Sequence, residues 1–252
     1  MVRLKSEKDL ELLRISGRIL AATLRALSKE VKAGVILSNL DKKAKELILK
    51  EGATPTFLGY TPEGATKAYA ASICASVNET IVHGLPGKYI LKEGDIISID
   101  LGVTYKGYVT DGAVTVGVGN ISEEARALLR VTHEALQNGI EECIPGKHLG
   151  DIGYAIEKTA QIGKFRVIQG LTGHGVGFAL HEDPSVFNYG KRGEGMKLVP
   201  GLVIAIEPMF SVKSPYIQQK KDDSFATKDG SLSAHFEHTV VITEEGFEVL
   251  TA

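Results

Sequence analysis

A short segment of the chain occurs twice, and this internal repeat constrains the fold more than any other feature of the sequence. Residues 91–100 read LKEGDIISID, and residues 198–207 read LVPGLVIAIE. In both segments a glycine turn leads into a short apolar run typical of a buried β-strand, and a carboxylate follows. Such self-similarity indicates repeated structural units. The sequence therefore predicts a single domain, 1–252, built from two equivalent halves, roughly 1–120 and 121–252.

Each half also supplies a second carboxylate, at the start of a β-rich segment. Asp111 opens the run DGAVTVG, and Glu237 opens the run EHTVVIT. If a pseudo-twofold axis relates the halves, these two carboxylates and the two that end the repeats, Asp100 and Glu207, can meet at its centre. Four buried carboxylates repel one another unless protons, basic residues or cations neutralise them. No Lys or Arg adjoins any of the four in the sequence, so bound cations are the favoured explanation.

The imidazole candidate for such a centre is His174, in the segment LTGHGVG. Its glycine neighbours let the backbone and a ligand approach closely. Four carboxylates and one imidazole suit two divalent first-row ions better than one, and oxygen-rich ligation favours manganese, iron or cobalt, with zinc also possible. Two such ions can share a bridging hydroxide and act as Lewis acids, the arrangement that hydrolases use.

Taken one at a time, these residues have ordinary structural explanations. An Asp that follows a strand most often belongs to a turn or a cap, and His174 can be a histidine satisfied within a glycine turn. Glu237 and His238 can be an exposed pair on an edge strand, and neither His83 nor His181 stands out alone. The joint occurrence of paired carboxylates and histidines flanked by Gly or Pro favours a site.

Composition excludes several classes of protein. The chain has 29 Lys and Arg against 31 Asp and Glu and no long basic block, so nucleic acid is not expected as its main ligand. Two cysteines, Cys74 and Cys143, are too few for a disulfide scaffold and, without a CxxC pair, for a thiolate zinc site. We find no signal-peptide core, and no apolar run approaches the ~18 residues of a membrane span. We therefore expect a soluble, cytoplasmic protein with no membrane contact.

Helices and strands alternate along the chain, which predicts an α+β fold. Capping signals and helical spacing predict four amphipathic helices, over residues 6–34, 38–52, 122–143 and 149–163. In the second of these, Ser38 and Asp41 form the predicted start signal. Strands are predicted at 96–100, 108–118, 165–169, 202–206 and 239–243. Residues 211–233 are the best candidate for a long surface excursion.

Longer motifs occur in a fixed order along almost the whole chain. They are SVNETIVHGLP (76–86), DIISID (95–100), DG (111–112), GHGVG (173–177), HEDP (181–184), IEPM (206–209) and SLSAHFEHT (231–239). In this order they resemble the type I methionine aminopeptidases. The resemblance implies the pita-bread fold, in which two pseudo-symmetric halves share a central curved antiparallel sheet covered by helices. It also implies removal of the initiator methionine from the N-terminal peptide of nascent proteins, with a small second residue preferred.

The resemblance assigns metal roles to the residues that the repeat singles out. It implies that Asp100 chelates one ion, that Asp111 and Glu237 bridge both, and that His174 and Glu207 complete the other. The resemblance also includes a monovalent cation held by backbone carbonyls near Asn78 and Ser233, which the pattern of side chains does not test. The sequence does not identify the physiological metal, because cellular supply decides occupancy more than ligand type does.

The resemblance also implies catalytic roles. His83 and His181 are expected to contact the amide of the substrate, and Glu207 to shuttle a proton from the bridging water. In the mechanism that we expect, the substrate's free α-amino group occupies an open metal position and the hydroxide attacks the first carbonyl, polarised by a metal and His181. Glu207 or His83 then delivers a proton to the leaving nitrogen.

A pocket for the methionine side chain is implied less closely. The residues that resemble the pocket of the family are Tyr60, Tyr69, Cys74 and Leu180. Extra residues around 61–68 lie between the two tyrosines, and the tryptophan expected before Thr-Lys-Asp is absent, which leaves Asp223, Ser224 or Phe225. We therefore expect a reshaped but apolar pocket that still suits methionine.

Three other protein classes remain as alternatives. Aminopeptidase P and prolidase share the ligand types but carry an added N-terminal domain. Type II methionine aminopeptidases carry a helical insertion where this chain has only a short span, between His174 and Glu207. A binding protein without catalysis is expected to have replaced some of the ligands, whereas all five are present here. We expect a monomer that contacts the ribosome transiently.

Overall fold

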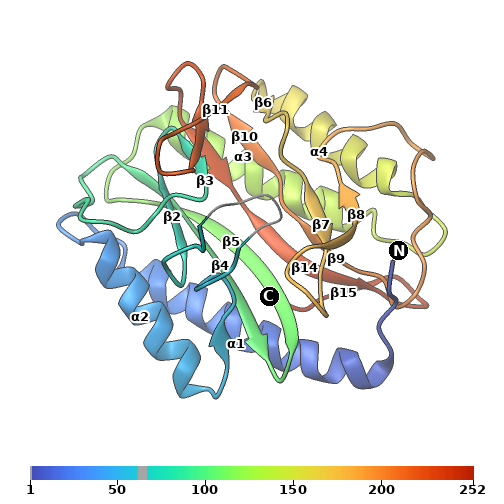
Figure 1. Ribbon diagram of the computed structural model, residues 1–252. Coiled ribbons are helices and arrows are strands. Elements are labelled where there is room, and N and C mark those ends of the chain that lie inside the picture. The colour runs from blue at the N-terminus through green and yellow to red at the C-terminus, as the bar shows by residue number, and fades with distance from the viewer. Residues whose placement is uncertain (1, 62–66) are drawn as a thin grey trace.

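The structure, a computed structural model, describes residues 2–61 and 67–252 (Figure 1). The described part contains four α-helices, close to the four that the sequence predicts. They are α1 (Glu7–Glu30), α2 (Leu37–Lys50), α3 (Glu123–Ile140) and α4 (Leu149–Gly163). None of them is long and apolar enough to cross a membrane. Most of the 61–68 insertion, residues 62–66, lies outside the described residues.

A nine-stranded antiparallel sheet forms the centre of the molecule. Its main path runs through β1 (Thr54–Pro55), β4 (Ile96–Tyr105), β5 (Tyr108–Gly117), β14 (Glu237–Ile242), β9 (Val203–Ile206), β7 (Gly173–Gly175) and β8 (Glu182–Val186). Two further strands pair with this path, β2 (Cys74–Val77) with β4 and β15 (Phe247–Val249) with β14. The order brings strands from both parts of the chain together, because β5 pairs with β14.

Two small sheets flank the central one. The first contains β13 (Ser233–His235), β10 (Met209–Ser211) and β6 (Arg166–Val167). The second contains β11 (Ile217–Gln219), β12 (Phe225–Thr227) and β3 (Thr80–Val82). The expected surface excursion over 211–233 is therefore only partly correct. Ala226 and Thr227 of β12 are buried, because β12 pairs with β3 and folds back onto the body of the protein.

The helices cover the sheet in two pairs. In Figure 1, α1 and α2 lie beside the β4–β5 hairpin, and α3 and α4 lie beside the strands that follow in the chain. Each pair contributes to a separate apolar cluster. Leu20, Leu40 and Ile99 belong to one, whereas Ile156 and Val240 belong to the other. This arrangement confirms the predicted α+β fold with a central antiparallel sheet covered by helices.

The first repeat continues beyond the strand that the sequence predicts. The strand does not end at Asp100, because β4 runs on to Tyr105 and the chain returns as β5. Lys106 and Gly107 form the connection, and both have positive φ, 49° and 86°. Such a two-residue turn matches the twist of a hairpin and lets both strands extend. Asp100 therefore lies inside a strand, whereas Glu207 directly follows β9 as expected.

The second helix lies close to its predicted range, but its predicted capping signal, Ser38 and Asp41, is wrong. α2 begins at Leu37, and the carboxylate of Asp41 accepts hydrogen bonds from the backbone N–H groups of Ser72 and Ile73. The backbone N–H groups of Leu37 and Ser38 donate instead to carbonyls of the 87–89 segment. A neighbouring loop thus satisfies the free amides of the first turn, so no side-chain cap is needed.

The serines of α2 and α3 provide a matched test of capping. Ser122 starts α3, and its hydroxyl accepts from the N–H of Ala125 at 3.1 Å. Ser122→Ala is expected to lower the free energy of unfolding by about 1 kcal/mol, because that N–H loses its acceptor. Ser38→Ala is expected to change it by less than about 0.5 kcal/mol. Urea denaturation of both variants measures the difference, and equal losses would contradict this account of α2.

Candidate metal centre

The register of the central sheet brings four carboxylates to one face, at the seam between β5 and β14. Asp100 on β4 and Glu237 on β14 both lie opposite Ala113 of β5, one on each side of it. Asp111 lies two residues before Ala113, and alternate residues of a strand project to the same face. Glu207 follows β9, the other neighbour of β14. Three adjacent strands and one strand end therefore supply the cluster.

All four carboxylates are buried. Burial raises the pKa of Asp111 to about 7. Burial and the charge of neighbouring carboxylates raise the pKa of Asp100, Glu207 and Glu237 well above their ordinary values. Without a cation, the cluster therefore keeps protons at a pH where exposed carboxylates have lost them.

Two threonine hydroxyls fasten the strands around the seam. Thr239 Oγ1 accepts from the backbone N–H of Asp111 at 2.9 Å and donates to the carbonyl of the same residue at 2.8 Å. Thr115 Oγ1 likewise accepts from the backbone N–H of His235 at 2.9 Å and donates to the carbonyl of His235 at 2.7 Å. Each hydroxyl thus forms hydrogen bonds with both the backbone N–H and the backbone carbonyl of one residue on another strand. The backbone of Asp111 is thereby fixed between the two parts of the chain.

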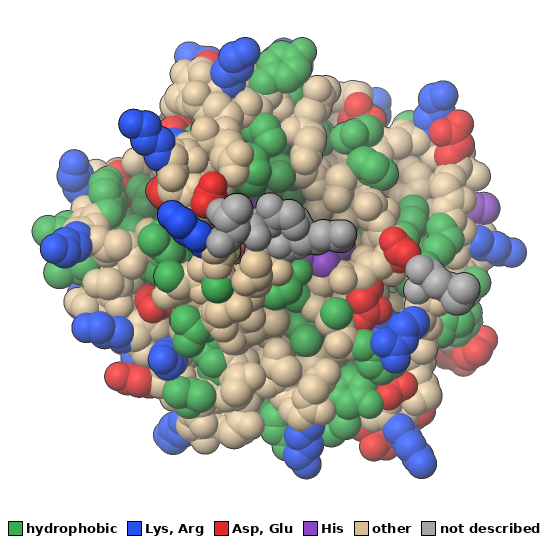
Figure 2. Space-filling model, viewed as in Figure 1, with side chains coloured by type: hydrophobic (Ala, Val, Ile, Leu, Met, Phe, Trp, Pro, Cys, Tyr) green, Lys and Arg blue, Asp and Glu red, His purple; other side chains and the backbone are tan. Residues whose placement is uncertain are grey.

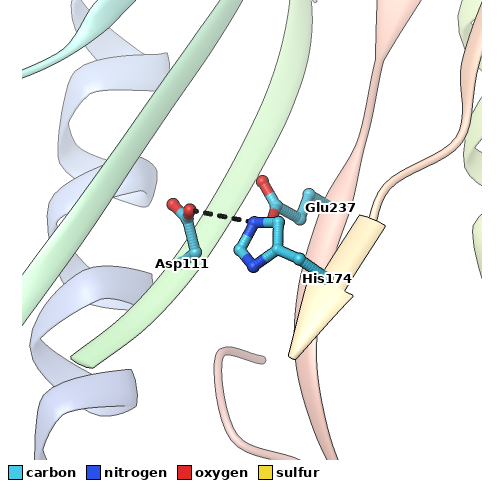
Figure 3. A group of neighbouring side chains, drawn as sticks. All are labelled: Asp111, His174 and Glu237. Carbon is cyan, nitrogen blue, oxygen red and sulfur yellow. Dashed lines mark ion pairs between the residues drawn. The ribbon is translucent and has the colours of Figure 1, made fainter. Parts of the chain in front are cut away.

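His174 lies on β7 and faces the cluster (Figure 3). Its Nε2 lies 3.8 Å from Oδ2 of Asp111 and 3.6 Å from Oε1 of Glu207. Its Nδ1 lies 2.9 Å from the carbonyl of Gly175, so the ring N–H belongs on Nδ1 and the lone pair on Nε2. Burial lowers the pKa of His174 to about 3, which keeps the ring neutral. This is the tautomer that a metal ligand needs.

The described residues fit a metal centre. Oδ1 of Asp100 and Oε1 of Glu237 are buried without a hydrogen-bond partner among the described residues. Asp111, His174 and Glu237 present ligand atoms within 4.8 Å of one another. Buried oxygens without donors, beside a neutral imidazole, are the groups that a divalent cation satisfies. The structure therefore brings together all five residues predicted as ligands: Asp100, Asp111, His174, Glu207 and Glu237.

Two histidines near this buried cluster, His83 and His181, are exposed. His181 follows β7, and its ring centroid lies 4.5 Å from that of His174, while its Nδ1 lies 2.7 Å from the hydroxyl of Tyr60. His83 follows β3, and its ring centroid lies 5.7 Å from that of Phe225. Desolvation by the surrounding protein lowers the pKa of both histidines. Figure 2 shows a histidine side chain at the surface near the centre of this face, beside hydrophobic side chains.

The residues predicted for the methionine pocket lie in one apolar cluster. Cys74 and Leu180 are buried in it, and Tyr60 and Tyr69 pack against it. Tyr69 donates its hydroxyl to the carbonyls of Ile73 and Gly84, so this hydroxyl serves the local fold. Cys74 lies opposite Asp100 on the neighbouring strand. The cluster therefore adjoins the carboxylates directly.

A buried ion pair supports the segment that carries His181. Nζ of Lys5 lies 2.7 Å from Oε2 of Glu182, and the side chain of Lys5 is 2% exposed. The other oxygen of Glu182 accepts from the backbone N–H groups of Phe178 and Ala179. Sequence reasoning did not identify this pair, because the two residues lie far apart in the chain and neither belongs to a repeat.

His235 is the residue of the centre that sequence reasoning missed. Its Nε2 lies 3.5 Å from Oε2 of Glu207 and 3.8 Å from Oε2 of Glu237, and these residues form a second possible ligand group. Burial lowers its pKa to about 3. The sequence could have indicated His235 by its position two residues before Glu237, because alternate residues of an extended segment project to the same face. It lacks the Gly or Pro neighbours that drew attention to the other histidines.

Comparisons with known proteins agree with this geometry. The model of metallopeptidase family M24 matches residues 11–244. The chain is 45% identical over 252 residues to methionine aminopeptidase 1 of Bacillus subtilis, across 100% of this chain and 99% of that protein. The crystal structure of methionine aminopeptidase from Rickettsia prowazekii matches with a TM-score of 0.95 and 36% identity, over 100% of both chains. The predicted resemblance and its pita-bread fold are thereby confirmed.

A more distant match bears on the fold alone. The prolidase from Pyrococcus furiosus has a TM-score of 0.79 and 23% identity, over 99% of this chain and 65% of that one. The same fold therefore occurs within a longer chain that bears the name of one alternative considered above. The two full-length matches at higher identity favour the methionine aminopeptidases over it.

The raised pKa values predict that cation binding releases protons. Asp111 is protonated below a pKa of about 7, whereas His174, with a pKa of about 3, is already neutral. Because a cation binds ionised carboxylates, its affinity should fall as the pH is lowered through about 7. Calorimetric titration of metal-free protein with Mn²⁺ at pH 6, in buffers of different ionisation enthalpy, measures the release. Binding without any proton release would contradict the raised pKa values.

Proposed function

Since the chain belongs to metallopeptidase family M24 and, within it, to the methionine aminopeptidases, we propose that it removes the N-terminal methionine from nascent proteins and peptides. We further propose that it prefers a small residue after the methionine. The observation that carries the proposal is a buried cluster of four carboxylates and one neutral imidazole below two exposed histidines. The buried groups suit cations, and the exposed rings can reach a peptide.

The metal complement that we propose is two divalent ions, drawn from cobalt, manganese, iron or zinc. Asp100 would chelate one ion, Asp111 and Glu237 would bridge both, and His174 and Glu207 would complete the other. The unpartnered buried oxygens of Asp100 and Glu237 support this assignment. When bound, the ions supply Lewis acidity that polarises the first carbonyl of the peptide and activates the attacking water.

His181 is proposed to bind the oxygen of the scissile amide. Its contact with the hydroxyl of Tyr60 orients the ring, and its exposed position leaves the other ring nitrogen accessible to substrate. His83 is proposed to contact the same amide. Either Glu207 or His83 then delivers a proton to the leaving nitrogen.

The free α-amino group of the substrate explains why the enzyme acts at chain ends. The unprotonated amine would take an open position on an ion that the carboxylates hold. An internal peptide bond offers no such group. The ions held by the carboxylates would thus select a free N-terminus, and the enzyme would act as an exopeptidase.

The side-chain pocket is proposed to be formed by Tyr60, Tyr69, Cys74 and Leu180. Their shared apolar cluster beside Asp100 supports this proposal. Phe225 lies against His83 and offers an apolar surface where the family has tryptophan. Such surroundings favour the unbranched, apolar side chain of methionine.

Further properties are proposed from the family and the sequence. We propose that the protein is a cytoplasmic monomer that contacts the ribosome transiently, and that 1–252 is one catalytic domain with halves near 1–120 and 121–252. The separate helix pairs beside β4–β5 and beside the later strands support the division into halves.

Release of free methionine is the direct test. Metal-stripped protein, titrated separately with Mn²⁺, Fe²⁺, Co²⁺ and Zn²⁺, is expected to cleave Met-Ala-Ser and to leave Met-Lys-Ser largely intact. Chelation should abolish the cleavage, because the carboxylates alone cannot polarise the carbonyl. An Xaa-Pro peptide is the specificity control. Cleavage of that peptide but not Met-Ala-Ser would favour a prolidase-like activity instead.

Two substitutions separate metal binding from substrate contact. Asp111→Ala is expected to abolish both activity and tight binding of the ions, because it removes a proposed bridging ligand. His181→Ala is expected to lower kcat by about 10²-fold or more while the metal content stays near that of the wild type. Metal analysis and peptide kinetics on the same preparations measure both effects. Near-normal turnover of Asp111→Ala would contradict the dinuclear assignment.

A further inference from the structure

His235 is a buried polar side chain of the centre to which the proposed function gives no role. It lies at the end of β13, opposite Met209 of β10. Its side chain is 2% exposed, and neither ring nitrogen has a hydrogen-bond partner among the described residues. Leaving a buried polar group without a partner is costly. A ring in this position therefore indicates an interaction beyond the hydrogen bonds of the ion-free site.

The ring approaches one carboxylate from the side away from His174. Nε2 of His235 lies 3.5 Å from Oε2 of Glu207, whereas Nε2 of His174 lies 3.6 Å from Oε1 of the same residue. The two imidazoles therefore face different oxygens of a single carboxylate. They also belong to different groups of neighbouring ligand atoms.

Because the two imidazoles face different oxygens of Glu207, the two oxygens can have different roles. An ion held by His174 would meet the oxygen of Glu207 that faces this ring, Oε1. The other oxygen, Oε2, stays buried and needs a hydrogen-bond donor, because carboxylates that bind metals are themselves hydrogen-bonded. An imidazole can present an N–H at Nε2, and a bond of this type measures about 2.7–2.9 Å. A shift of less than about 1 Å would close the observed contact to that length.

We propose that His235 is a positioning residue of the metal centre, which donates Nε2–H to Oε2 of Glu207 and so orients Oε1 toward the ion shared with His174. This role rests on the proposed function, since it requires a bound cation. The backbone of His235 is held for this task, because Thr115 clasps its N–H and its carbonyl. Through Glu207, the ring sets how tightly one ion is held.

Three variants of the full-length chain test this role. His235→Leu removes the donor, and it is expected to weaken the binding of one Mn²⁺ ion by about 10–100-fold. His235→Gln keeps an N–H donor in a side chain of similar reach, and is expected to bind both ions nearly as the wild type does. His133→Leu is the matched control, because this exposed ring packs on Phe236 and lies outside the cluster. Calorimetric titration of metal-free protein measures all three affinities.

Thermal unfolding of the metal-free variants distinguishes positioning from a structural role. His235→Leu should leave the metal-free Tm unchanged or raised, because leucine replaces two unpartnered buried nitrogens. A lowered metal-free Tm with unchanged Mn²⁺ affinity would overturn the proposal. So would His235→Gln binding as weakly as His235→Leu, since this would indicate a ligating nitrogen instead of a donor. A wild-type protein that binds no divalent ion would overturn the proposed function first, and the role of His235 with it.

Discussion

The pairing of β5 with β14 is the contact on which the rest of the site depends. In this pairing Ala113 lies opposite Glu237, and Gly112 lies opposite His238. A shift of one residue would turn Glu237 to the other face of the sheet. The pairing therefore decides whether the carboxylates meet. It also brings like charges together, and two unit charges 4 Å apart repel by about 4 kcal/mol at an effective dielectric constant of 20.

The apolar clusters on each side of the seam offset this repulsion. Each cluster joins a helix pair to the sheet, so the acid-bearing strands are fixed by packing that does not involve the carboxylates. The repulsion between the carboxylates is thus an unfavourable local interaction that the packing of the surrounding residues outweighs, as is common at functional sites. A bound cation replaces the repulsion between the carboxylates with metal–ligand attraction. Bound cations would therefore stabilise the ionised form of carboxylates whose pKa values burial raises in this chain.

The sequence predicts the carboxylates because each lies in an apolar strand segment or directly after one, and a strand pattern can be recognised locally. Asp100 was placed at the end of a strand because the turn at Lys106 and Gly107 was not identified, yet its side chain still reaches the cluster. His235 was missed because its proximity to Glu207 depends on the pairing of β13 with β10, which no local pattern reveals. Ser38 failed as a cap for the same reason, since a distant loop supplies the acceptors.

The hydrogen bonds of Thr115 and Thr239 limit which substitutions these two positions tolerate. A β-branched side chain has few χ1 rotamers, so the strand itself aims the hydroxyls of Thr115 and Thr239. Valine would fill the same space without the oxygen, and serine would keep the oxygen without the restricted rotamer. Neighbouring aliphatic residues can replace one another while the volume of the core is conserved. The hydroxyls of Thr115 and Thr239 therefore contribute to the alignment of the strands around the seam, and side-chain size alone does not distinguish these threonines from valine.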